Sequence, residues 1–165
     1  MTTPTLPVHA LYSHLGTAIA TSLGSAWRRS GRHPESLDEL VSNPETTRLW
    51  SLAVVASSWA DDGAARQRVP SVARAETQVR LSFLRRVRAA DGAVADYVAG
   101  LQDEQTAILA VLGVSRAVPG YGPIQALLWQ GTPTRAPVVT DAAATVMRVD
   151  LDFVAVHTIP LVTSP

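Results

Sequence analysis

The chain has 165 residues, a formal net charge of zero and no cysteine. This length is typical of one domain that buries about two thirds of its unfolded surface, so we expect a single domain over residues 1–165. The missing cysteine excludes disulfides, thiolate zinc sites and a thiol nucleophile, and the balanced charge does not indicate general affinity for nucleic acid or membranes. No stretch reaches the roughly twenty apolar residues that span a bilayer, and the N-terminus lacks a signal-peptide pattern, so we expect an intracellular product.

An amphipathic helix is predicted first, over residues 7–23. Pro7 suits the first position of a helix, and Gly24 can end it. Apolar side chains recur between them at three- and four-residue intervals, and this face should lie against a sheet: Val8, Leu11, Leu15, Ile19 and Leu23. Residues 25–47 are expected to be an irregular insertion that contains one short helix over residues 34–41.

Two strands are predicted next. Residues 48–59 alternate as a largely buried strand does, although a short buried helix has the same composition. Among the four tryptophans we expect at least two in the core, with Trp50 the best candidate. A polar loop begins at Asp61 and Asp62, and residues 76–87 then fit either a strand or a helix; their β-branched and aromatic residues favour a strand paired with 48–59. If both segments were helices, the protein would be an all-helical adaptor.

A second helix is predicted from Asp91, a good N-cap, to the stop at Gly113. Gly100 and Asp103 allow a kink or a break within it. Its apolar positions have helical spacing: Val94, Val98, Leu101, Ile108 and Leu112. Residues 113–145 are expected to be a second irregular insertion, with a turn at 119–123, a strand over 124–130 and a loop or hairpin arm over 131–141, where Pro133 and Pro137 occur.

The strongest periodicity in the chain belongs to the final strand, residues 146–157. Met147, Val149, Leu151, Phe153 and Ala155 project to one face, and Arg148, Asp150 and Asp152 project to the other. We expect Leu151 and Phe153 to be buried beneath the helix 91–112 and Asp150 to be solvated, so that its replacement by alanine is nearly silent. From Val154 onward both faces are apolar, which indicates a covered or interfacial region. The predicted fold class is therefore α+β: a mainly antiparallel sheet with two helices packed on one face and long irregular loops.

Patterns of catalysis or metal binding are not found in the sequence. The four histidines, His9, His14, His33 and His157, lie in unrelated contexts without the spacing of a metal site. Asp150 and Asp152 share a face, but paired carboxylates on an alternating strand are usually its solvated face. There is no phosphate loop and no Gly-x-Ser-x-Gly motif. We therefore expect no enzyme activity, no metal and no cofactor.

Charged residues provide the candidate interface sites. Arg85, Arg86 and Arg88 end a predicted strand, where they either are solvated or contact an acidic partner. Their possible partners on another copy are the acidic loop at Asp61 and Asp62 and the face of Asp150 and Asp152.

The succession of elements resembles that of the tail terminator, or tail completion, proteins of long-tailed bacteriophages. It consists of the helix 7–23, the strand around 49–55, the polar loop 61–64, the strand 77–83 followed by the helix 91–112, and the final strand 147–157. The resemblance lies in the order of elements and in no motif. It implies a structural subunit that forms a hexameric ring with itself, caps the tail tube and binds the tube protein and the head-tail connector. DNA would pass through the ring lumen without sequence-specific binding, and the protein would be located in the virion after assembly in the host cytoplasm.

A second interpretation is a small bacterial α+β enzyme or ligand-binding protein, which would be cytoplasmic. It requires a pocket between the sheet and the helices, with convergent polar groups such as His157 and Asp152.

Overall fold

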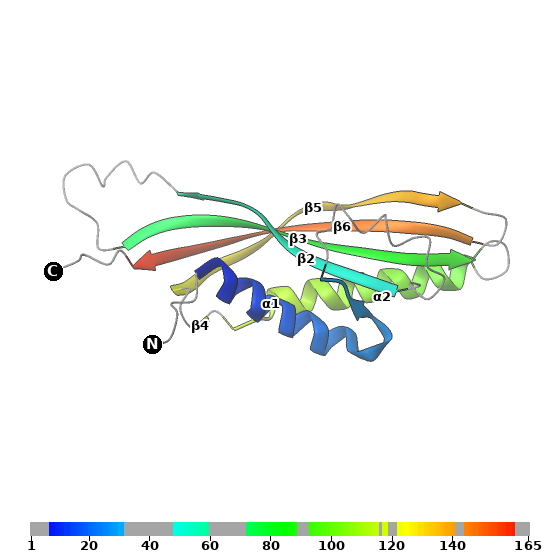
Figure 1. Cartoon of the computed structure of the whole chain (residues 1–165), viewed down its shortest axis with the longest axis horizontal. Coiled ribbons are helices and arrows are strands. Elements are labelled where there is room, and N and C mark those ends of the chain that lie inside the picture. Colours follow the sequence, from blue (N-terminus) through cyan, green and yellow to red (C-terminus); the bar gives the residue numbers. More distant parts are fainter. Residues whose placement is uncertain are drawn as a thin grey trace.

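The computed structural model describes residues 7–31, 48–59, 72–88, 93–115, 117–118, 122–140 and 144–160. Both helices lie on the same side of a long, twisted sheet (Figure 1). The predicted α+β class, with two helices on one face of a mainly antiparallel sheet, is confirmed. In chain order the elements are α1 (Pro7–Leu23), the 3-10 turn η1 (Gly24–Ala26), β1 (Arg28–Arg29), β2 (Arg48–Trp59), β3 (Val72–Arg88), α2 (Ala93–Leu112), β4 (Ala117–Val118), β5 (Gly122–Thr140) and β6 (Ala144–Pro160).

The strands follow the order β1-β2-β3-β6-β5-β4 across the sheet. Neighbouring strands are antiparallel except for β1 and β2, which are parallel. The central pair, β3 and β6, is in register over its whole length, from Val72 opposite Pro160 to Arg88 opposite Ala144. Strands β1 and β4 could not be predicted from the sequence, because two-residue strands have no detectable periodicity.

The first helix has the predicted bounds. Leu11, Leu15 and Ile19 are fully buried against the sheet, and the helix ends at Leu23 because Gly24 adopts a positive φ of 64°. The short helix predicted over residues 34–41, within the first expected insertion, lies outside the described residues.

Residues 48–59 and 76–87 are strands that pair with each other, as predicted, so the all-helical adaptor is excluded. Trp50 is buried in the core, as is Trp27, whose indole ring meets the Phe83 ring edge-on with 5.0 Å between centroids. The expectation of at least two core tryptophans is therefore confirmed. Trp129, by contrast, is largely exposed.

The second helix is continuous from Ala93 to Leu112, so neither Gly100 nor Asp103 breaks it. Its predicted stop is confirmed, since the Gly113 N–H donates to the Leu109 carbonyl at 2.8 Å and the helix ends there. The predicted N-cap, Asp91, lies outside the described residues. Neither described helix is long and apolar enough to cross a membrane.

The expectation that residues 113–145 form an irregular insertion is wrong, because β5 is a single strand of 19 residues, Gly122–Thr140. The strand predicted over 124–130 is confirmed as part of it, and residues 131–140 continue the strand as a hairpin arm beside β6, which was one of the two predicted alternatives. Proline is tolerated at a sheet edge, where a missing N–H breaks no ladder bond. The pairing of β5 with β6 shifts register near Gly131, which has a φ of 78°, and again beyond Pro137. These irregularities bend the strand without ending it.

The faces of β6 were predicted correctly. Leu151 and Phe153 are buried in the core that both helices share with the sheet, and Val154 and Val156 are buried on the other face. Asp150 and Asp152 lie on that second face, as expected, but they are half-buried and paired instead of solvated.

Candidate functional site

Arg85, proposed from the sequence as a solvated interface residue, is buried. It is only 4% exposed, because alternation along β3 directs it to the same face as Phe83, beneath α2. Its Nη2 lies 3.1 Å from Oε1 of the buried Glu104 on α2, and the other oxygen of Glu104 accepts a hydrogen bond from Arg135 on β5. This buried ion triad joins β3, α2 and β5, so Arg85 is a structural residue and its assignment as an interface candidate was wrong.

The helix α2 is shaped to receive the Arg85 side chain. A Cβ atom built on Gly100 would overlap the Arg85 guanidinium, so only glycine leaves room for it. The Tyr97 ring, one turn earlier on the helix, has its centroid 5.9 Å from Arg85 Cζ, within the range of a cation–π contact. Glycine in mid-helix is therefore explained by the close approach of a buried cation.

A similar contact occurs between the buried Gly16 on α1 and an arginine that is exposed. A Cβ atom on Gly16 would lie 2.7 Å from Nη1 of Arg29, whose guanidinium also covers the rings of Tyr12 and Trp50. Because Arg29 is exposed, its side chain can move away at little cost.

These two glycines provide a matched pair of variants. In a helix interior, alanine is more favourable than glycine by about 1 kcal/mol in the free energy of helix formation. For Gly100→Ala we expect a net loss of about 1–3 kcal/mol, because the added methyl group displaces the buried Arg85. Gly16→Ala should stay within about 1 kcal/mol of the parent protein, since Arg29 can move. Urea titrations of both variants check this, and equal stabilities would show that Arg85 does not require the glycine.

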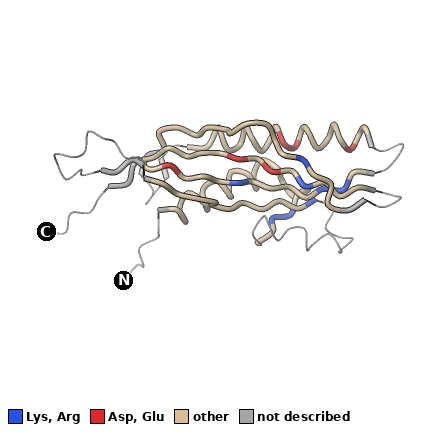
Figure 2. Tube along the Cα trace, turned by 90° about the horizontal axis from the view of Figure 1, so that it is seen from above, with Lys and Arg blue, Asp and Glu red and all other residues tan. Residues whose placement is uncertain are grey.

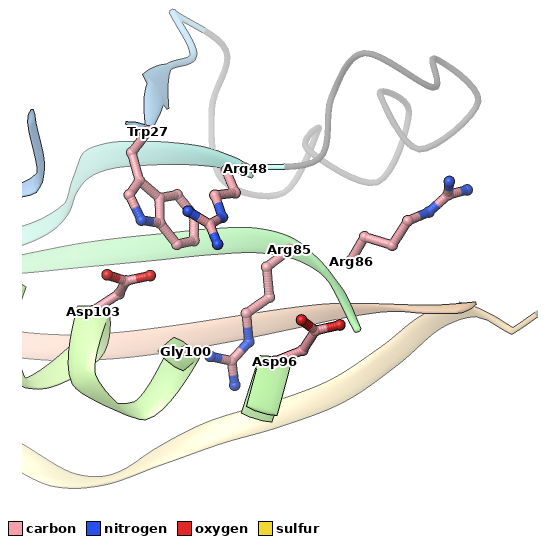
Figure 3. Close-up of a pocket in the computed structure, with 7 residues that line it drawn as sticks. All are labelled: Trp27, Arg48, Arg85, Arg86, Asp96, Gly100 and Asp103. Carbon is pink, nitrogen blue, oxygen red and sulfur yellow. The ribbon is translucent and has the colours of Figure 1, made fainter. Parts of the chain in front are cut away.

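A polar pocket lies beside Arg85, where β2 begins and β3 ends (Figure 3). In Figure 3, Arg86 extends away from Arg85, as alternation along a strand requires. Three arginines and two aspartates leave the pocket with little net charge, so it favours neither anions nor cations strongly. Its lining residues are Trp27, Arg48, Arg85, Arg86, Asp96, Gly100 and Asp103.

The remaining charged candidates are separated. Arg86 is exposed. The Arg88 side chain, Asp61 and Asp62 lie outside the part of the chain that the structure describes. The described arginines gather toward the end of the sheet where β2 begins and β3 ends (Figure 2).

Asp150 and Asp152 belong to a ladder of polar pairs on the face of the sheet opposite α1 and α2. Nε and Nη2 of Arg80 donate to the two carboxylate oxygens of Asp152 at 2.8 and 3.1 Å. Asp150 accepts from the Ser82 hydroxyl and, at 3.2 Å, from Arg148 Nε. Their carboxylates are occupied by cross-strand partners and a neighbour on β6, so these two residues stabilise the sheet instead of offering a free acidic face to another subunit.

His157 does not converge with Asp152, as the pocket interpretation required. It lies on the helix-bearing face, five residues along β6, whereas Asp152 lies on the other face. A chain of hydrogen bonds links the exposed Ser57 hydroxyl to Thr77 at 3.1 Å and the buried Thr77 to His157 Nε2 at 3.0 Å. Burial lowers the pKa of His157, so its ring is neutral at pH 7. Its contact with Thr77 therefore joins two strands of the core.

The largest feature that the sequence analysis missed is an exposed apolar surface on α2. Of the apolar positions with helical spacing, Ile108 is buried, whereas Val94 is 76% exposed, and Val98 and Leu112 are also exposed. The line that faces the core consists of Gly100, Glu104, Ala107, Ile108 and Val111. We call the exposed set the α2 stripe, and its members are Val94, Val98, Leu109 and Leu112.

The α2 stripe was missed because the helix has two apolar lines, and sequence periodicity does not say which one faces the sheet. The signal that distinguishes them is the buried glycine: the core-facing line contains Gly100 and Glu104, which receive Arg85.

Within the described residues, no three histidine, aspartate or glutamate side chains gather as a metal site would require. No protein-family model matches the sequence, and comparison with curated proteins gives no match.

Proposed function

We propose that this protein is a structural subunit that assembles with copies of itself into a ring, and that the ring is the tail terminator of a long-tailed bacteriophage. It would cap the tail tube, bind the head-tail connector on its other face and let DNA pass through its lumen. The exposed α2 stripe is the observation that supports the proposed self-assembly. Leu109 alone is 69% exposed, and a helix with large apolar side chains on its outer surface is typical of a protein that binds another protein there.

The order of elements supports the more specific part of this proposal. In the sequence, the resemblance to tail terminators lies in a helix, two strands, a helix and a final strand, and α1, β2, β3, α2 and β6 follow one another in this order, with β4 and β5 between α2 and β6.

An enzyme is less well supported. The pocket beside Arg85 has little net charge and contains no Ser, Thr or His among its lining residues, so it offers no activated hydroxyl nucleophile. His157, the histidine with a perturbed pKa, bonds to Thr77 in the core, at a distance from that pocket in the fold.

The mass of the protein in solution, combined with electron micrographs, tests this proposal. We expect one discrete oligomer, hexameric if the resemblance holds, that appears as a ring with a central hole. The ring should also stop the growth of tail tubes assembled in vitro from the tube protein of the same phage. A protein that remains a monomer at all concentrations would contradict the ring, whereas a ring without effect on tubes would contradict the tail terminator.

A further inference from the structure

The two helices lie side by side beneath the sheet and present different surfaces to solvent (Figure 1). Among the 17 residues of α1 there is no Asp, Glu, Lys or Arg, and apart from His9 the side chains that point away from the sheet are small, including Ser13, Thr17 and Ala20. On α2 the exposed residues of the stripe are large and apolar. The charged residues of that helix, Asp96, Asp103 and Glu104, lie off the stripe.

Helix geometry defines the direction of each surface. At about 100° per residue, the four stripe residues fall within a sector of about 60°, roughly a third of a turn from the line through Glu104, Ala107 and Val111 that faces the core. Ser13 and Thr17 lie on the side of α1 opposite the buried Leu11 and Leu15. Both surfaces are therefore turned away from the core of their own subunit.

We propose that in the ring the α2 stripe packs against the outer surface of α1 on the neighbouring copy. This inference rests on the proposed function and adds the interface to it. Large side chains on one helix and small ones on the other allow close packing of the two helices. Because neither surface contains a charge, no ion has to be removed from water without a partner. Two different surfaces of the same chain make a head-to-tail contact, which is the kind that closes a ring.

A second copy explains the stripe better than a lipid surface does. Helices that lie on membranes usually have lysine or arginine on their polar face, whereas α2 has three acidic residues and no basic residue. Self-pairing of two α2 stripes would bury the large residues, but it would give a two-fold dimer and leave the uncharged surface of α1 exposed.

Because the chain has no cysteine, the contact can be tested by pairwise cross-linking. We would introduce Thr17→Cys and Leu109→Cys together and treat the native oligomer with a short bis-maleimide. A ladder of covalent oligomers, up to the size of the ring, is expected on a denaturing gel. Each single-cysteine variant should give only monomers. A second double variant, Ser13→Cys with Leu112→Cys, tests the same contact about one turn further along both helices.

The control is Gln78→Cys with Leu109→Cys, because Gln78 is exposed on the face of the sheet opposite α1 and α2 and should form no ladder. Dimers formed by Leu109→Cys alone would show two-fold pairing of α2 and overturn the inference. Intact rings in which neither helix pair cross-links would overturn it too, while the proposed function would stand. If no oligomer is present before cross-linking, the proposed function itself fails.

Discussion

Replacing Glu104 with alanine is expected to reduce the free energy of unfolding by about 3–5 kcal/mol, because it leaves the buried Arg85 without a counter-ion. Burial of a cation is tolerated only when an anion accompanies it, and only 3% of the surface of Glu104 is exposed. The same change deprives Arg135 of its partner on α2. Urea titration followed by circular dichroism measures the loss.

Two further variants distinguish the triad from a general effect of removing an acid on α2. Asp103→Ala, at the half-exposed acid next to Glu104, should change stability by at most about 0.5 kcal/mol. A double variant, Arg85→Met with Glu104→Leu, should recover much of the loss, because apolar residues of similar size often replace a buried ion pair at no cost. If Glu104→Ala were no more destabilising than Asp103→Ala, the triad would not hold the three elements together.

Phe153→Ala is expected to cost about 3–5 kcal/mol, since it removes a large buried ring and leaves a cavity. Phe153 is 1% exposed and lies on β6, opposite Val79 on β3 and Trp129 on β5, in the cluster that both helices share. Thermal and urea unfolding should both show the loss. Leu109→Ala, on the exposed stripe, should leave the stability of the monomer almost unchanged.

The structure changes the expectation for Asp150. From the sequence it was expected to be solvated and its replacement silent, but the carboxylate accepts hydrogen bonds from Ser82 and Arg148. We now expect Asp150→Ala to cost about 1–2 kcal/mol, the usual cost of leaving half-buried donors unpaired. A loss as large as that of Phe153→Ala would mean that the two faces of β6 have been exchanged.

The elements with one clear periodicity could be predicted from the sequence. The bounds of α1 followed from Pro7 and Gly24, and β2 followed from an alternating run around Trp50. For β3, β-branched and aromatic residues decided correctly between strand and helix. In each case local chemistry and burial favour the same structure, so no information about tertiary contacts is needed.

The burial of Arg85 depends partly on contacts with residues that are distant in the sequence. Its placement on the core face follows from alternation with Phe83, and that signal was present in the sequence. Its partner Glu104, however, is on another element, and a glutamate in mid-helix is ordinarily exposed. The exposure of the α2 stripe could not be predicted for the same reason. The contact of Gly100 and Glu104 with Arg85, on another element, determines which side of α2 faces the core and leaves the stripe on the outside.

The length of β5 was missed because Pro133 and Pro137 usually mark loops. Among the described strands, β4 pairs only with Gly122 and Pro123, so the rest of β5 lies at the edge of the sheet, where proline is compatible with a strand. Three prolines and three register shifts also make β5 a poor template for a further strand. This is a second reason to place the subunit contact on the helices.

The pairing of β3 with β6 also determines how the chain can fold. Residues 72 and 160 are partners in the ladder, and both helix α2 and strand β5 lie between them in the chain. Contacts between such distant segments form slowly, because a long loop must close before any of its pairs is made. During synthesis, β2 with β3 and the helices can form early, but the centre of the sheet stays open until β6 has left the ribosome. Strand β6, which follows all the other described strands in the chain, is thus the one that joins the two halves of the sheet.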